Sequence, residues 1–126
     1  MNKIQKLPES ELLIMQALWK SKEPLGSSSI NELLDNDVSW KPSTLATLIS
    51  RLIEKGFIKA EKNGRYPIYS YIISEEEYLK VETKSFFKKL HKNSLKSFIT
   101  ALYDSNGISD DDIDEMLTWL KNKDRS

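Results

Sequence analysis

Hydrophobic side chains recur at helical spacing in three segments of the first half of the chain. The first segment opens at Leu7-Pro8-Glu9, where a proline and an acidic residue suit a first helical turn. A shorter segment follows a serine run, and its Ser29 and Glu32 fit a capping box. The third begins at Pro42 and stops at Gly56, with apolar residues three and four apart between them. The pattern therefore predicts three short helices.

Two β-prone runs come next, residues 57–62 and 65–73, separated by Asn63-Gly64. Asn-Gly is typical of a type I′ turn, which needs positive φ at both central residues, so a β-hairpin is predicted. Pro67 has no amide hydrogen, and its position must face a sheet edge or a bulge. Three helices followed by a hairpin is the order of a winged helix. The hairpin tyrosines Tyr66, Tyr69 and Tyr71 favour packing in the core and hairpin over stacking on bases.

From Ser74 onward the pattern predicts three further amphipathic helices. Their stripes are more apolar than short helices can hide alone, so a homodimer is expected, with its interface in this half. The predicted fold is mainly α with a small β-hairpin: a winged helix-turn-helix N-terminal domain, residues 1–73, plus a C-terminal helical dimerisation region, residues 74–126. The residues expected at the dimer interface are Tyr78, Phe86, Leu95, Phe98, Ile99, Leu102, Ile113, Met116, Leu117 and Leu120.

Composition narrows the function classes. The chain has 126 residues, 39% hydrophobic and 30% charged, as in a globular protein of one small domain or a domain with an appendage. No apolar run is long enough for a membrane span and no signal peptide is apparent, so a cytoplasmic protein without membrane insertion is expected. Without cysteine and with His91 as its one histidine, the sequence offers no catalytic or metal-binding constellation. We expect no enzyme activity, no metal and no cofactor.

Charge and side-chain size point to DNA. Residues 41–73 contain six basic and two acidic side chains, a net charge of +4, while residues 74–126 are net acidic. The polar face of the third helix carries small hydroxyls and one arginine, which suits a backbone that approaches the major groove of double-stranded DNA. The expected DNA-binding residues are Lys41, Ser43, Thr44, Ala46, Thr47 and Arg51 on or beside that helix, and Lys62 and Arg65 on the hairpin. A winged-helix module that binds protein and not DNA is the alternative.

Three motifs resemble the BlaI/MecI penicillinase-repressor family: residues 11–19, the string from Trp40 to Leu52, and residues 64–69. The likeness extends from about Leu7 to Lys121. It implies a dimeric repressor that binds operators ahead of β-lactam-resistance or related genes and is inactivated by proteolysis, through a protease linked to a membrane sensor. The family is cut in its dimerisation region at Asn-Phe. The matching residues here are Ala101 and Leu102, the expected cleavage site.

Overall fold

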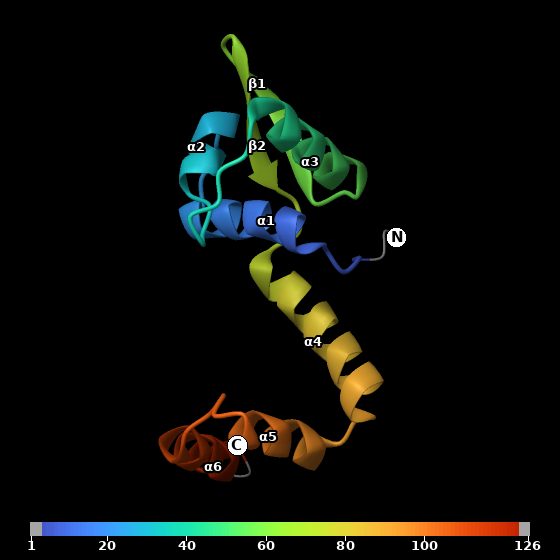
Figure 1. The fold of residues 1–126 in the computed structure, drawn as a ribbon, viewed down its shortest axis with the longest axis vertical. Coiled ribbons are helices and arrows are strands. Elements are labelled where there is room, and N and C mark those ends of the chain that lie inside the picture. Colours follow the sequence, from blue (N-terminus) through green and yellow to red (C-terminus); the bar gives the residue numbers. More distant parts are fainter. Residues whose placement is uncertain (1–3, 124–126) are drawn as a thin grey trace. The chain divides into compact units, whose positions relative to one another are not determined.

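The computed structural model describes residues 4–123. Helices α1 (Glu9–Ser21), α2 (Ser27–Glu32) and α3 (Pro42–Glu54) precede strands β1 (Ile58–Asn63) and β2 (Tyr66–Tyr71), and helices α4 (Glu75–His91), α5 (Leu95–Asp104) and α6 (Asp110–Lys123) follow them (Figure 1). This order confirms the predicted class, mainly α with one hairpin. The chain divides into two compact units between residues 82 and 83, inside α4. The outer ends of the two predicted domains lie outside the described residues.

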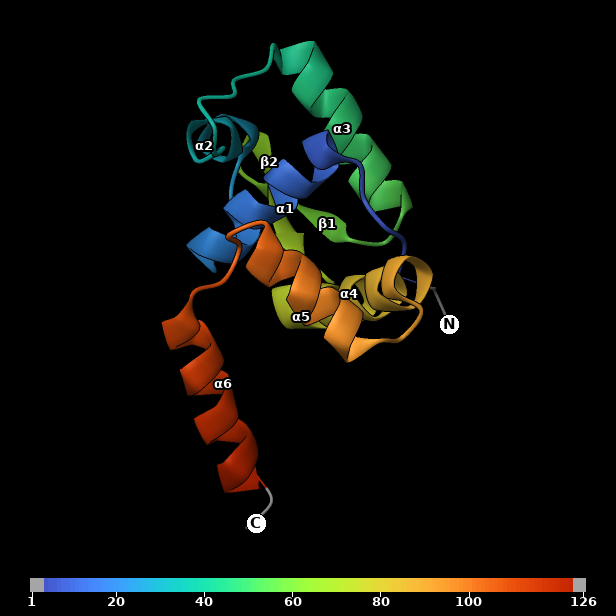
Figure 2. The same ribbon diagram turned by 60° about the horizontal axis from the view of Figure 1, so that its bottom comes forward.

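A single hydrophobic core fills the first unit. Helix α1 packs against α2, α3 and β2, and Figure 2 shows it lying across the strands with α3 beside it. The side chains of Ile14, Met15 and Leu18 are almost fully enclosed, as is Phe57 at the end of the loop that leads from α3 into β1. Because α1 is apolar on nearly every side, it is the central element around which the unit is built.

Helix α3 has the bounds that its pattern predicts. Pro42 occupies the first helical position, and the four core-facing side chains Leu45, Leu48, Ile49 and Leu52 are buried. Gly56 ends the helix with φ at 81°, and the Phe57 amide donates to the Leu52 carbonyl at 2.9 Å. This left-handed residue after the last turn is the expected role of glycine at a helix C-terminus.

The start of α2 corrects one prediction. Its N-cap is Gly26, in an extended conformation, and Ser29 is already the third helical residue, so Ser29 and Glu32 form no capping box. The helix begins early because Leu25 is held by two backbone hydrogen bonds to Tyr69 of β2, at 2.8 and 2.9 Å. A reciprocal cap of this kind does form at α4, between Ser74 and Glu77, with both bonds at 3.1 Å.

The hairpin turn is one residue later than predicted. Asn63 pairs with Tyr66, so the two central turn residues are Gly64 and Arg65, not Asn63 and Gly64. Of these two central residues, only Gly64 has a positive φ, 68°, which is the pattern of a type II′ turn with glycine at its first central position. Glycine adopts this conformation without strain, whereas a type I′ turn would require it of a second residue with a Cβ. Arg65 therefore lies at the tip of the hairpin.

Pro67 lies where its missing amide hydrogen costs nothing. It pairs with Lys62 two positions from the turn, at a site where the amide of β2 faces away from β1. Two residues further on, the Tyr69 amide on that same edge donates to Leu25, which adds a short third segment to the sheet. The prediction that Pro67 faces an edge is confirmed.

The first turn of α4 belongs to the first unit, which corrects the expectation for Tyr78. Its side chain is 6% exposed and packs beside the rings of Trp19 and Phe57, with centroids 5.8 Å away in each case. Its hydroxyl accepts a hydrogen bond from the Leu7 amide at 3.0 Å, and the Trp19 indole donates to the Ile73 carbonyl at 3.0 Å. Tyr78 therefore completes the core of its own unit and has no surface left for a dimer interface.

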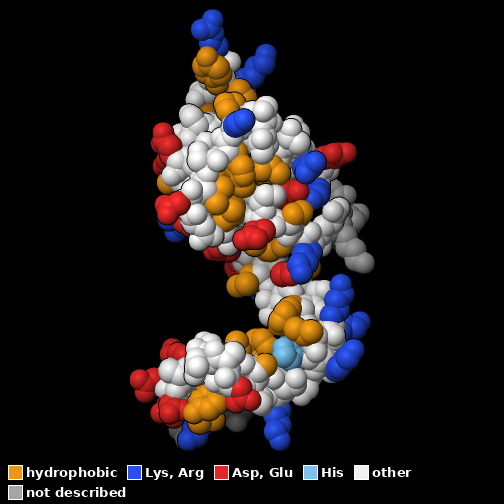
Figure 3. Space-filling model, viewed as in Figure 1, with side chains coloured by type: hydrophobic (Ala, Val, Ile, Leu, Met, Phe, Trp, Pro, Cys, Tyr) orange, Lys and Arg blue, Asp and Glu red, His pale blue; other side chains and the backbone are white. Residues whose placement is uncertain are grey.

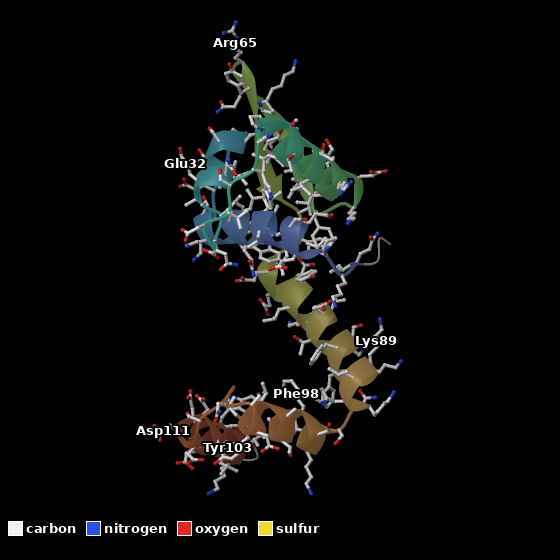
Figure 4. The ribbon with its side chains drawn as sticks, viewed as in Figure 1. Glu32, Arg65, Lys89, Phe98, Tyr103 and Asp111 are labelled. Atoms are coloured by element: carbon white, nitrogen blue, oxygen red, sulfur yellow. The ribbon has the colours of Figure 1, made fainter. Side chains whose placement is uncertain are left out.

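The second unit consists of α4 from Thr83, α5 and α6. Ring contacts join α4 to α5: the centroid of Phe98 lies 5.3 Å from that of His91 and 6.0 Å from that of Phe87, and Phe98 is labelled in Figure 4. The His91 Nδ1 lies 2.9 Å from the Ser97 hydroxyl. An apolar cavity of about 210 Å³ remains beside these rings, between Phe86 and Leu95. No side chain of α5 or α6 is fully buried, so this unit lacks a closed core of its own.

Candidate nucleic-acid interface

Helix α3 presents a polar face of small side chains. Ser43, Thr44, Ala46, Thr47 and Arg51 are all exposed, as is Lys41 at the N-cap, whereas the opposite face is buried in the core. The Thr47 hydroxyl donates to the Ser43 carbonyl at 3.0 Å. Its proton is therefore engaged within the helix, and toward a ligand it offers an acceptor oxygen and a methyl group. Short side chains let the backbone of such a helix approach base edges closely.

The charged residues of α3 do not neutralise one another. Within residues 4–123, Arg51 forms no ion pair, although Glu54 is three residues away on the same helix. The guanidinium is therefore available to a base edge or a phosphate, the two groups that arginine binds most strongly in DNA.

Asn31 positions the chain that enters α3. Its Oδ1 accepts from the Trp40 amide at 3.1 Å, and its Nδ2 donates to the Trp40 carbonyl at 3.1 Å and to the Ser39 hydroxyl at 3.2 Å. The Asn31 side chain thus satisfies both backbone groups of Trp40, as a neighbouring strand would in a β-sheet. Sequence reasoning missed Asn31, since a lone amide on a short helix carries no local signal of such a partner.

The hairpin tip carries the second group of candidate residues. Lys62 and Arg65 are exposed, and Figure 4 shows Arg65 pointing away from the unit at the far end of the strands. In the described part of the chain neither cation forms an ion pair. The nearby Glu61 is already paired, since its carboxylate lies 3.4 Å from the Lys59 ammonium. The tip also holds Tyr66, which is 72% exposed. The expectation that Tyr66 packs inside the hairpin or the core is wrong, whereas Tyr69 is half-buried against the core as expected.

The candidate dimer residues other than Tyr78 all lie in the second unit. Four of them are exposed, Phe86, Leu95, Leu117 and Leu120, and the other five, Phe98, Ile99, Leu102, Ile113 and Met116, are half-buried. Leu90, at 64%, and Trp119, at 56%, are also exposed, although the sequence pattern did not single them out as interface residues. This surface is a candidate for contact with a second chain.

The expected cleavage site lies inside a helix. Ala101 is exposed and Leu102 half-buried, and both belong to α5. The Leu102 carbonyl accepts from the Gly107 amide at 2.7 Å, which ties the end of α5 to the following turn. Since a protease binds its substrate in extended form, cleavage at this bond would require α5 to open locally.

Two further features are absent from the described residues, a cluster of metal-binding side chains and a membrane-spanning helix. No group of three or more histidine or acidic side chains within residues 4–123 is arranged to hold a metal ion. None of the helices formed by these residues combines the length and the apolar character needed to cross a bilayer.

Comparison with known proteins agrees with this geometry. A family model described as penicillinase repressor matches residues 7–122. The penicillinase repressor of Bacillus licheniformis is 28% identical over 121 residues, which cover 96% of this chain and 94% of that protein. The methicillin resistance regulatory protein MecI of Staphylococcus aureus strain N315 is 28% identical over 122 residues, 97% of this chain and 98% of that one.

Two solved structures match the first part of the chain. The solution structure of the DNA-binding domain of the repressor BlaI is 32% identical and covers 62% of this chain and 94% of its own, with a TM-score of 0.52. The monomeric form of Bacillus licheniformis BlaI, solved in complex with the blaP half-operator, has the same identity and coverage and a TM-score of 0.50. The chain belongs to the penicillinase repressor family, whose members are DNA-binding transcriptional repressors and not enzymes.

Proposed function

We propose that this chain represses transcription by binding, as a homodimer, a palindromic operator in double-stranded DNA. The proposal rests on two features that occur together in the first unit. Helix α3 exposes a face of small side chains with an unpaired Arg51, and the tip of the hairpin is cationic. A helix of this kind reads base edges in the major groove, while hairpin cations contact the backbone or the minor groove. The half-operator complex of the related BlaI supports DNA as the ligand.

The dimer is proposed from the second unit. Its helices leave large apolar side chains such as Leu90, Leu95 and Trp119 more than half exposed, and contact with a second copy would remove them from water. A twofold dimer places its two α3 helices on half-sites one helical turn, or a multiple, apart, so the operator is expected to be palindromic. Two linked contacts bind about 10²–10⁴ times more tightly than one, which makes repression depend on the dimer.

The relatives' names support a role in controlling β-lactam-resistance or related genes. Proteolysis within the dimerisation region would end repression, because each separated DNA-binding domain then holds the operator through a single α3 helix. Ala101-Leu102 is the proposed bond, cut by a protease linked to a membrane sensor after α5 opens.

A fluorescence-anisotropy titration tests the proposal. The full chain is titrated into labelled duplexes from the promoter of its own operon and into a scrambled duplex, at physiological salt. We expect specific binding at least a thousandfold tighter than nonspecific binding, and a footprint with two symmetric protected half-sites. Equal, weak binding to both duplexes would instead favour the protein-interaction module.

A further inference from the structure

Tyr66 is the most exposed large hydrophobic side chain in the described part of the chain, at 72%. It is the first residue of β2 and pairs with Asn63 directly across the Gly64-Arg65 turn. Since successive side chains of a strand alternate between faces, Tyr66 and Tyr69 point to opposite sides of the hairpin. Tyr69 reaches the core, and Tyr66 extends beyond it.

The fold gives Tyr66 no partner. Among residues 4–123 its ring packs against no other ring, and its hydroxyl forms no hydrogen bond. A single exposed apolar side chain is ordinary on a protein surface, so its exposure alone does not indicate a binding role. The position and the neighbours of Tyr66 carry the argument.

The residues next to Tyr66 at the tip are mainly cationic. Arg65 directly precedes Tyr66 in the turn, while Lys62 pairs with Pro67 and so points to the other face of the hairpin. Glu61 shares the face of Tyr66, and its carboxylate lies 3.4 Å from the Lys59 ammonium. Figure 3 shows hydrophobic atoms between basic side chains at this end of the molecule, with no acidic side chain among them on the visible face. An exposed aromatic ring beside an arginine at the tip suits a ligand that combines negative charge with flat or apolar surfaces, and a nucleic acid backbone with its sugars is such a ligand.

We propose that Tyr66 is an additional DNA-contacting residue of the hairpin, whose ring packs against the deoxyribose backbone at the minor groove while Arg65 supplies the charge. This inference rests on the proposed binding of double-stranded DNA. The contact is apolar, so it contributes affinity without releasing counterions, whereas the contact of Arg65 releases about one. The two neighbouring residues are therefore separable in a salt series.

The experiment measures the dissociation constant of full-length wild type, Tyr66→Ala, Tyr66→Phe and Arg65→Ala for one operator duplex at four salt concentrations. We expect Tyr66→Ala to weaken binding roughly tenfold at every concentration with an unchanged slope of log affinity against log salt. Arg65→Ala should reduce that slope by about one. Tyr66→Phe keeps the ring and should bind within about threefold of wild type. Tyr71→Ala, at the base of the same strand and 38% exposed, is the matched control and should bind as wild type does.

Nitration by tetranitromethane, read by mass spectrometry, provides a measurement on the unmodified chain. Tyr66 should react quickly in free protein and be protected in the operator complex, while Tyr71 reacts alike in both. Wild-type affinity in Tyr66→Ala, a loss in Tyr66→Phe as large as in Tyr66→Ala, or nitration of Tyr66 unchanged by operator would each overturn the proposal. Failure of the wild type to bind any duplex specifically would overturn the proposed function instead.

Discussion

The carboxylate of Glu11 and the ammonium of Lys55 form an ion pair that joins the beginning of α1 to the residue directly after α3. The pair is asymmetric, because the Glu11 side chain is 2% exposed and that of Lys55 is 24% exposed. It fixes the C-terminal end of the helix whose outer face is proposed to read DNA. Asn31 holds the other end through the backbone of Trp40.

The asymmetry predicts unequal effects of removing either partner. Lys55→Met leaves a buried carboxylate without its counter-ion and should destabilise the full chain by about 3 kcal/mol. Glu11→Gln removes the buried charge and leaves a lysine that can turn toward water, so its cost should be about 1 kcal/mol. Urea denaturation followed by circular dichroism measures both. If Glu11→Gln proves the more destabilising of the two, the ion pair does not have the role that its burial indicates.

Arg51→Ala should weaken operator binding by about 1–3 kcal/mol, because a charge-assisted contact to a base edge or phosphate is lost. The matched control is Lys80→Ala, an exposed cation on α4. Both variants are titrated with the same labelled duplex at physiological salt. Equal affinities of the two variants would show that the outer face of α3 does not contact DNA.

The position of Tyr78 makes a prediction about truncation. A fragment of residues 1–82 keeps the contacts of Tyr78 with Leu7, Trp19 and Phe57, whereas a fragment of residues 1–73 loses them all. Losing a buried aromatic side chain from a core costs about 3–5 kcal/mol, so the shorter fragment should melt at a clearly lower temperature.

The longer fragment also tests the dimer. Sedimentation should show residues 1–82 as a monomer and the full chain as a dimer, with weaker operator binding by the fragment. A fragment that holds the operator as tightly as the full chain would contradict the proposed role of the second unit.

Tyr103 and Asp110 connect α5 to α6 by a hydrogen bond in which the phenol donates to the carboxylate at 2.8 Å. This bond, together with the negative charge of Asp110, raises the pKa of Tyr103 above its ordinary value of 10.0. The hydrogen bond therefore stabilises the folded chain fully below pH 10, and this contribution is lost as the pH rises through the higher pKa that Tyr103 has in the folded state. Asp110→Asn should lower the pKa of Tyr103, as followed by NMR of ¹³C-labelled tyrosine. An unchanged titration would mean that the bond does not persist in solution.

Much of the fold follows from local patterns in the sequence. The apolar spacing from Leu45 to Leu52 determines which face of α3 is buried, and Gly56 determines where the helix stops, because both depend on residues within one or two turns. The order of the helices and strands, and the exposure of the small polar side chains of α3, can be predicted for the same reason. The family resemblance adds the expectation of a repressor.

The tertiary structure alone decided the features that depend on distant partners. The bonds from Leu25 to Tyr69 start α2 early and remove the Ser29 cap, and the core draws in Tyr78 from a helix whose apolar stripe indicated a dimer contact. Asn31 acquires its role only because Trp40 folds back beside it. Tyr66 and Tyr69 have the same chemistry and lie on opposite faces of the hairpin, and the packing of the whole unit decides which face meets the core and how far the tip extends beyond it.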